Sequence, residues 1–178
     1  ARVVEGDRRI DALEEEVEGL AVQLIALRAP MADDLREVLT GMKFANTLER
    51  VADHAKNIAK RVSEIDTSVR IEPMSVLPAM ASVAGEMLHD VLDAFAARDI
   101  EAARRVCERD RAVDDLYNSI FRALVTFMME NPKSISQAAH LLFIAKNLER
   151  IGDQATNLAE MVHYAATGER MVERERAL

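Results

Sequence analysis

The sequence is poor in cysteine, in the residues that interrupt helices and in aromatic side chains. Cys107 is its one cysteine, so no intrachain disulfide can form, which is typical of a reducing compartment and predicts a cytoplasmic protein. Six glycines, four prolines and 4% aromatic residues in 178 positions are few for a sheet protein. Since 49% of the residues are hydrophobic and Ala, Leu, Glu and Arg abound, the chain can bury a core with long helices. We therefore predict an all-α fold.

Long apolar runs and an excess of positive charge are also missing. No segment approaches the roughly 18 to 20 apolar residues of a membrane-spanning helix, so the protein is expected to be peripheral to a membrane at most. A formal net charge of −8 disfavours nucleic acid as a partner, because such binding depends on Lys and Arg. The first residues lack the apolar core of a signal peptide and an initiator Met, so we expect a fragment that is truncated at its front.

Apolar residues spaced by three and four predict long helices over about 3–28 and 32–61. Further helices are expected at 76–98, at 113–129 and after the Asn131-Pro132 break. We divide the chain into a first helical unit at 1–66, a Pro- and Ser-containing linker at 67–78, a second helical unit at 79–165 and a frayed tail at 166–178.

The two units repeat one another. The segment 48–59, LERVADHAKNIA, matches the segment 148–159, LERIGDQATNLA, at seven of twelve positions, far above chance. The helix before each copy matches as well, since 3–13 resembles 106–116. A helix at about 76–98 precedes these two in the second unit, and its counterpart would lie before residue 1. The sequence thus predicts two tandem three-helix bundles, the first of which lacks its first helix in this chain.

Each unit carries two pairs of carboxylates four residues apart, which places each pair on one helix face. The eight residues are Asp7, Asp11, Glu49 and Asp53 in the first unit, and Asp110, Asp114, Glu149 and Asp153 in the second. Stacked like charges destabilise a helix, and a bound cation would offset them. Carboxylate oxygens suit hard cations, so we predict two metal clusters of divalent or trivalent ions, Mg, Mn, Fe or Zn.

Asn57 and Asn157 extend the two motifs by one turn and could ligate a cation or orient a carboxylate. The alternative left open is that the acidic residues are ordinary solvated side chains paired with Arg50 and Arg150. His54 becomes Gln154 in the second copy, so histidine is not a shared ligand and His54 is expected to be a bystander. The Glu-x-x-His pairs of di-iron helices are absent, which disfavours oxygen chemistry.

The motif L-E-R-[IV]-x-D-x-A-x-N-[IL]-A in both halves, together with the paired [ED]-x-x-x-D motifs, resembles the PhoU family of phosphate-transport accessory proteins. The resemblance implies a cytoplasmic negative regulator of phosphate uptake and phosphate-starvation signalling, without enzymatic turnover. It implies an adaptor between the ATPase subunit of a phosphate ABC transporter and a sensor histidine kinase, with metal on the eight carboxylates. The first pair of each unit is Asp/Asp here, where the family commonly has Glu/Asp.

Two other functions stay open from the residues alone. A multinuclear carboxylate site could hydrolyse phosphate esters, but no general-base histidine recurs and no Gly-rich phosphate loop exists. A helical scaffold without metal is the second alternative.

The truncated first unit predicts an exposed apolar patch where its missing helix would pack. Its residues would be Ile10, Leu13, Val17, Leu48, Ala52 and Ala55. Because a large apolar patch favours association, we expect a homodimer.

Overall fold

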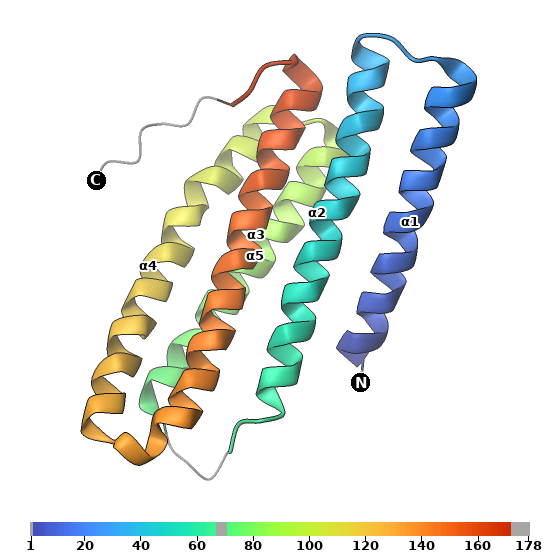
Figure 1. Cartoon of the computed structure of the whole chain (residues 1–178). Coiled ribbons are helices and arrows are strands. Elements are labelled where there is room, and N and C mark those ends of the chain that lie inside the picture. The colour runs from blue at the N-terminus through green and yellow to red at the C-terminus, as the bar shows by residue number, and fades with distance from the viewer. Residues whose placement is uncertain (1, 67–70, 172–178) are drawn as a thin grey trace.

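The computed structural model describes residues 2–66 and 71–171, and their regular structure is helical (Figure 1). The α-helices are α1 (Arg2–Arg28), α2 (Asp33–Val62), α3 (Leu77–Ala97), α4 (Ile100–Glu130) and α5 (Ile135–Thr167). Two short 3-10 helices, Glu72–Val76 and Pro132–Ser134, precede α3 and α5. No strand occurs in the described ranges, which confirms the all-α prediction. None of these helices is long and apolar enough to cross a membrane.

Local signals place most helix ends. Pro30 separates α1 from α2, and Pro132 follows the end of α4 at Glu130. Gly168 adopts the left-handed conformation, with φ of 75°, and ends α5. The start of α4 lies well before the predicted residue 113, because Asp99 caps it: its side chain accepts a hydrogen bond from the backbone N–H of Ala102 at 2.9 Å. Of the predicted linker and tail, residues 67–70 and 172–178 lie outside the described residues.

The helices α3, α4 and α5 pack together into a three-helix bundle (Figure 1). Its centre is filled by large side chains without solvent exposure, including Met80 and Met87 of α3, Leu124 of α4, and Leu141 and Leu158 of α5. Burying such side chains is the main favourable contribution to folding, at about 1.5–3 kcal/mol each.

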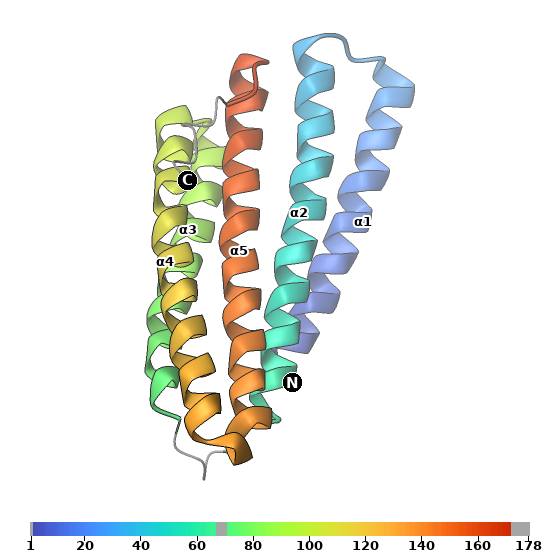
Figure 2. The same cartoon turned by 60° about the vertical axis from the view of Figure 1, so that its left-hand side comes forward.

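The helix α2 joins α1 to this bundle by packing along α5, and α5, α2 and α1 stand in a row (Figure 2). Three contacts show that α2 and α5 run antiparallel in one register. Arg36 Nε donates to the backbone oxygen of Ala165 at 3.3 Å, His54 meets Asn147, and Arg61 meets His140. Between the first and the last contact, α2 advances from Arg36 to Arg61, and α5 goes back by the same number of residues, from Ala165 to His140. The seam between the two helices therefore extends over almost their whole length.

The apolar patch expected on the first unit is only partly present. Leu13 and Val17 of α1 are 51% and 36% exposed, as predicted, and further apolar residues of α1 such as Leu24 are exposed too. The expectation is wrong for Ala52, which is 6% exposed, and Leu48 is also partly covered. The physical reason is that α2 packs between α1 and α5, so both sides of it are covered within the same chain, and Ala52 lies one turn before Lys56, which bonds Asp7 of α1. The homodimer stays a prediction.

Candidate functional site

The first acidic cluster lies between α1 and α2 and is bridged by a lysine. Lys56 Nζ lies 2.8 Å from Asp7 Oδ2 and 2.5 Å from Asp53 Oδ1. Asp7 is only 5% exposed, and its other oxygen, Oδ1, is buried without a hydrogen-bond partner. The hydrogen bonds to Asp53 and then to Asp7 raise the pKa of Lys56, so its ammonium stays charged. The predicted helix faces do meet, but a built-in cation stands between their carboxylates.

Glu49 belongs to the same cluster. Burial raises the pKa of its carboxyl, and the negative charges of Asp53 and Asp11 raise it further, whereas Lys56 opposes them. Glu49 thus lies close enough to Asp11 of α1 and to Asp53 and Lys56 of α2 for their charges to act on its carboxyl. Additional positive charge at this place would favour the ionised form of Glu49.

The second acidic cluster lies between α4 and α5. Glu149 Oε1 accepts a hydrogen bond from Lys146 Nζ at 2.6 Å, and Glu149 Oε2 is buried without a hydrogen-bond partner. Asp110 of α4 reaches the backbone of α5 at Gly152, where an added Cβ would lie 3.6 Å from Asp110 Oδ1. The same Cβ would lie 3.3 Å from Val113 Cγ1, which is tighter than ordinary contact. Gly152 therefore permits the close approach of the two helices that carry the cluster.

The repeat differs at the position of the lysine that bridges the first cluster. Lys56 in the first unit corresponds to Thr156 in the second, and Thr156 Oγ1 is buried without a hydrogen-bond partner. Sequence reasoning missed Lys56, although its position three residues after Asp53 is a usual spacing for a helical ion pair. Asn57 and Asn157 are both exposed, and neither is a buried ligand.

The oxygen chemistry of the two clusters fits a hard cation unequally. Across residues 2–66 and 71–171, no three His, Cys, Asp or Glu side chains converge closely enough to hold a metal ion as they stand. The first cluster does not fit a metal ion unless Lys56 moves, because the ammonium already bonds Asp7 and Asp53. The second cluster presents Glu149 Oε2 and Thr156 Oγ1, two buried oxygens without partners, and fits better.

The cations that pair with the acidic motifs are not the predicted arginines. Lys56 pairs with Asp53, and Lys146 pairs with Glu149 while also lying 5.1 Å from the ring centre of Tyr117. Arg150 instead lines a pocket on α5 that Lys146 also lines.

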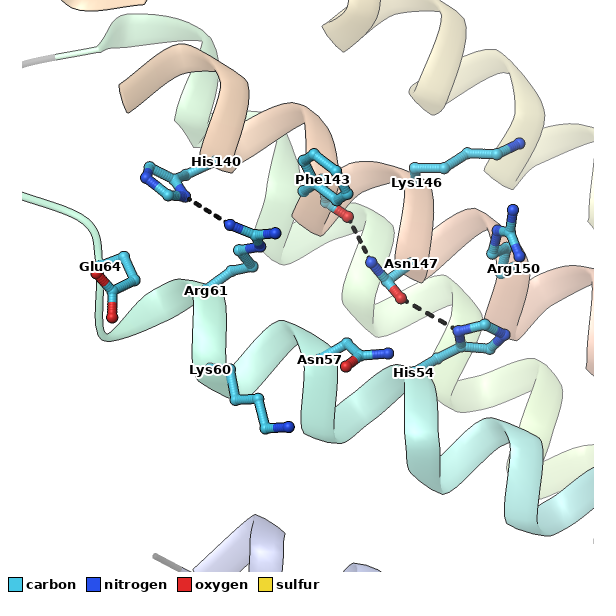
Figure 3. A pocket seen from close by; sticks show the side chains of 10 residues that line it. All are labelled: His54, Asn57, Lys60, Arg61, Glu64, His140, Phe143, Lys146, Asn147 and Arg150. Atoms are coloured by element: carbon cyan, nitrogen blue, oxygen red, sulfur yellow. Dashed lines mark hydrogen bonds between the residues drawn. The ribbon is translucent and has the colours of Figure 1, made fainter. Parts of the chain in front are cut away.

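This pocket lies on the seam between α2 and α5 and has a volume of about 630 Å³ (Figure 3). It is lined by His54, Asn57, Lys60, Arg61 and Glu64 of α2, and by His140, Phe143, Lys146, Asn147 and Arg150 of α5. His54, expected to be a bystander, is hydrogen-bonded through Nδ1 to Asn147 Oδ1 at 3.1 Å and ties the two helices together. Sequence reasoning missed the pocket, because its two walls come from segments about 90 residues apart.

Comparison with known proteins finds one and the same family in both helical units. The family model described as "PhoU domain" matches residues 1–62 and again 77–162. A relative from Zymomonas mobilis named "Phosphate-specific transport system accessory protein PhoU homolog" is 57% identical over 176 residues, which cover 99% of this chain and 74% of the relative. A protein of the same name from Caulobacter vibrioides is 48% identical over 173 residues, covering 95% of this chain and 74% of that protein.

Solved structures agree with these relatives. The crystal structure of PhoU from Pseudomonas aeruginosa superposes with a TM-score of 0.90 at 35% identity, covering 94% of this chain and 81% of that one. The phosphate transport system regulatory protein PhoU from Streptococcus pneumoniae gives a TM-score of 0.88 at 29% identity, covering 96% and 80%.

Proposed function

The chain belongs to the PhoU family, and we propose that it is an accessory regulator of a phosphate transport system that restrains phosphate uptake and starvation signalling when phosphate is plentiful. The observation that carries this proposal is that the family model matches both repeat units rather than one of them. Relatives that share most of the chain carry the name of a phosphate transport accessory protein, which supports the same role here.

The output of this regulator is binding rather than turnover. Its long, packed helices offer extended faces, and we propose that these contact the ATPase subunit of a phosphate ABC transporter and a sensor histidine kinase in the cytoplasm. A phosphate-ester hydrolase is less well supported, because the histidine of the acidic motif, His54, bonds Asn147 on the α2–α5 seam and is replaced by Gln154 in the other unit.

We further propose that both acidic clusters bind hard metal ions and that the second binds them more tightly than the first. In the second cluster, Glu149 with Asp153, Asp110 and Asp114 would hold the ion, and the buried oxygen atoms Glu149 Oε2 and Thr156 Oγ1 support this. In the first, a metal ion competes with Lys56 for the carboxylates. A metal ion, when bound, would neutralise the stacked carboxylates and fix the paired helices relative to one another.

The regulatory role is tested by a promoter measurement. In a cell deleted for the native gene, the intact full-length protein is expected to repress a phosphate-responsive promoter at high phosphate. Replacing Glu49, Asp53, Glu149 and Asp153 together by Ala is expected to relieve much of that repression, because losing the clusters loosens the helix faces that a partner contacts. Promoter output and circular dichroism of both proteins are the measurements.

A matched control removes the same number of negative charges away from the clusters. Its substitutions are Glu15→Ala, Glu18→Ala, Glu101→Ala and Glu130→Ala, all at exposed positions. This variant is expected to repress like the intact protein. If the intact protein fails to repress, the regulatory role is wrong. If the folded cluster variant represses as well as the control, the clusters are incidental to regulation.

Cys107 offers a reporter for metal at the second cluster. Burial raises its pKa to about 11, and the negative charges of Glu160 and Asp110 contribute to that shift. A cation bound at Asp110 would reduce this contribution, so the pKa of Cys107 would fall and the thiolate fraction at a given pH would rise. Alkylation of this single cysteine by iodoacetamide, measured between pH 8 and pH 10, is therefore expected to become faster when Mn²⁺ is added.

Two variants distinguish the clusters in this assay. Glu149→Gln is expected to weaken the effect of Mn²⁺ on the alkylation of Cys107. Lys56→Thr is expected to increase the Mn²⁺ bound per chain in equilibrium dialysis, while leaving the reactivity of Cys107 unchanged. An equal response of Cys107 in the intact protein and in Glu149→Gln would contradict a metal site at the second cluster. Unchanged binding in Lys56→Thr would contradict competition by the lysine.

A further inference from the structure

The pocket on the α2–α5 seam has walls that are held in place by their own contacts (Figure 3). The guanidinium of Arg61 lies 4.4 Å from the centre of the Phe143 ring, and its Nη1 lies 3.5 Å from His140 Nδ1. Asn147 donates from Nδ2 to the backbone oxygen of Phe143 at 2.8 Å and meets His54 Nδ1 through its Oδ1. Arg61 and the side chains around it are thus positioned before any ligand arrives, which lowers the cost of binding.

The pocket concentrates positive charge in a protein whose net charge is −8. Four cationic side chains line it, against the single carboxylate of Glu64. Lys146 is compensated by its ion pair with Glu149 outside the pocket. Within the described residues, neither Arg61 nor Arg150 forms an ion pair with a carboxylate. Their charges are consequently available to an anion.

The internal repeat keeps only one of these four cations, since Arg150 corresponds to Arg50 but the other three have no cationic counterpart. A shift of 100 residues carries α2 onto α5, and it replaces His54 by Gln154, Lys60 by Glu160 and Arg61 by Met161. Because the helices are antiparallel, these counterparts lie towards the opposite end of the seam. The helix packing of the repeat therefore does not require a basic pocket, so packing alone does not account for the cations at one end of the seam.

We propose that this pocket binds a multivalent phosphate anion, either an inorganic chain of phosphoryl groups or the phosphate tail of a nucleotide. Guanidinium groups match phosphate oxygens with paired donors, and Asn57 and Lys60 add an amide and an ammonium. The volume of about 630 Å³ suits a small ligand. The eight residues from His54 to Arg61 extend over about 10 Å of helix, which favours several phosphoryl groups over one. The proposal stands on the pocket and does not rest on the regulatory role.

Calorimetric titration of the full-length protein, freed of metal by chelation, tests the site. The probes are pyrophosphate, tripolyphosphate, ATP and sulfate. Saturable binding is expected for the first three, with sulfate weaker because it carries less charge. The double variant Arg61→Gln, Arg150→Gln is expected to bind at least about tenfold more weakly, since it loses two charged donors.

The matched control is Lys43→Gln, Arg105→Gln, which removes two exposed positive charges that do not line the pocket. It is expected to bind the probes as the intact protein does. Binding of ATP and tripolyphosphate with the same affinity would support an inorganic source, and tighter binding of ATP would support a nucleotide. The proposal is overturned if no phosphate probe binds the folded protein, if both double variants lose affinity equally, or if only an acidic peptide such as oligoglutamate binds.

Discussion

Replacing Phe44 by Ala is expected to lower the free energy of unfolding by about 3–5 kcal/mol and to loosen α1 and α2 from the three-helix bundle. Phe44 lies on α2, is 4% exposed, and stacks on Phe95 of α3 with 4.0 Å between ring centres and 22° between planes. Removing the ring leaves a cavity at the junction and deletes an aromatic pair. Urea unfolding measures the loss, and amide hydrogen exchange locates it, with faster exchange expected first in α1 and α2.

The control for this substitution is Phe121→Ala on α4, because Phe121 is 44% exposed and its ring also lies near another aromatic ring, that of Tyr117. It is expected to cost no more than about 1 kcal/mol. If the two substitutions cost the same, or if exchange in Phe44→Ala rises equally in all helices, Phe44 does not hold α2 on the bundle.

Replacing Gly152 by Leu is expected to destabilise the protein by about 1–3 kcal/mol, although leucine favours helices over glycine. The first added carbon would lie 3.3 Å from Val113 Cγ1, and Val113 is fully buried in α4. The further carbons would push α4 away from α5 and displace Asp110, whose Oδ1 lies 3.6 Å from the position of that first carbon. Thermal unfolding measures the effect, and the Mn²⁺ response of Cys107 is expected to weaken with it.

Gly85→Leu on α3 is the matched control. Gly85 also lies inside a helix, but a Cβ added there meets nothing within 4 Å. This substitution is expected to stabilise the protein by roughly 0.5–1 kcal/mol, because it removes the backbone entropy cost of glycine. The two substitutions should therefore have opposite signs. A gain in stability for Gly152→Leu would contradict the close approach of α4 and α5.

The acidic motifs illustrate how far sequence reasoning reaches into the candidate site. The positions of Asp7 in its helix and of Asp53 in its helix predicted the faces on which they meet, because the period of an α-helix is fixed. The bridge by Lys56 was not foreseen, since its long side chain can reach several positions and the packing of α1 selects one. Whether metal ions bind at these carboxylates remains a prediction.

The buried face of α2 illustrates the opposite case. Apolar periodicity marked the stripe that contains Ala52, but periodicity does not say which helix covers it, and the sequence reasoning assigned that place to a missing helix. In the structure α2 packs between α1 and α5 of the same chain, which covers Ala52, and the packing on α5 brings His54 to Asn147.

The sequence by itself determined the helices, most of their ends and the internal repeat, because these depend on residues a few positions apart and on the match of one segment with another. Only the tertiary structure decided that α2 packs antiparallel on α5, that Lys56 bridges Asp7 and Asp53, and that the basic side chains of two helices form one pocket. The reason is that each of these features joins residues dozens of positions apart, and the packing of whole helix faces selects their register.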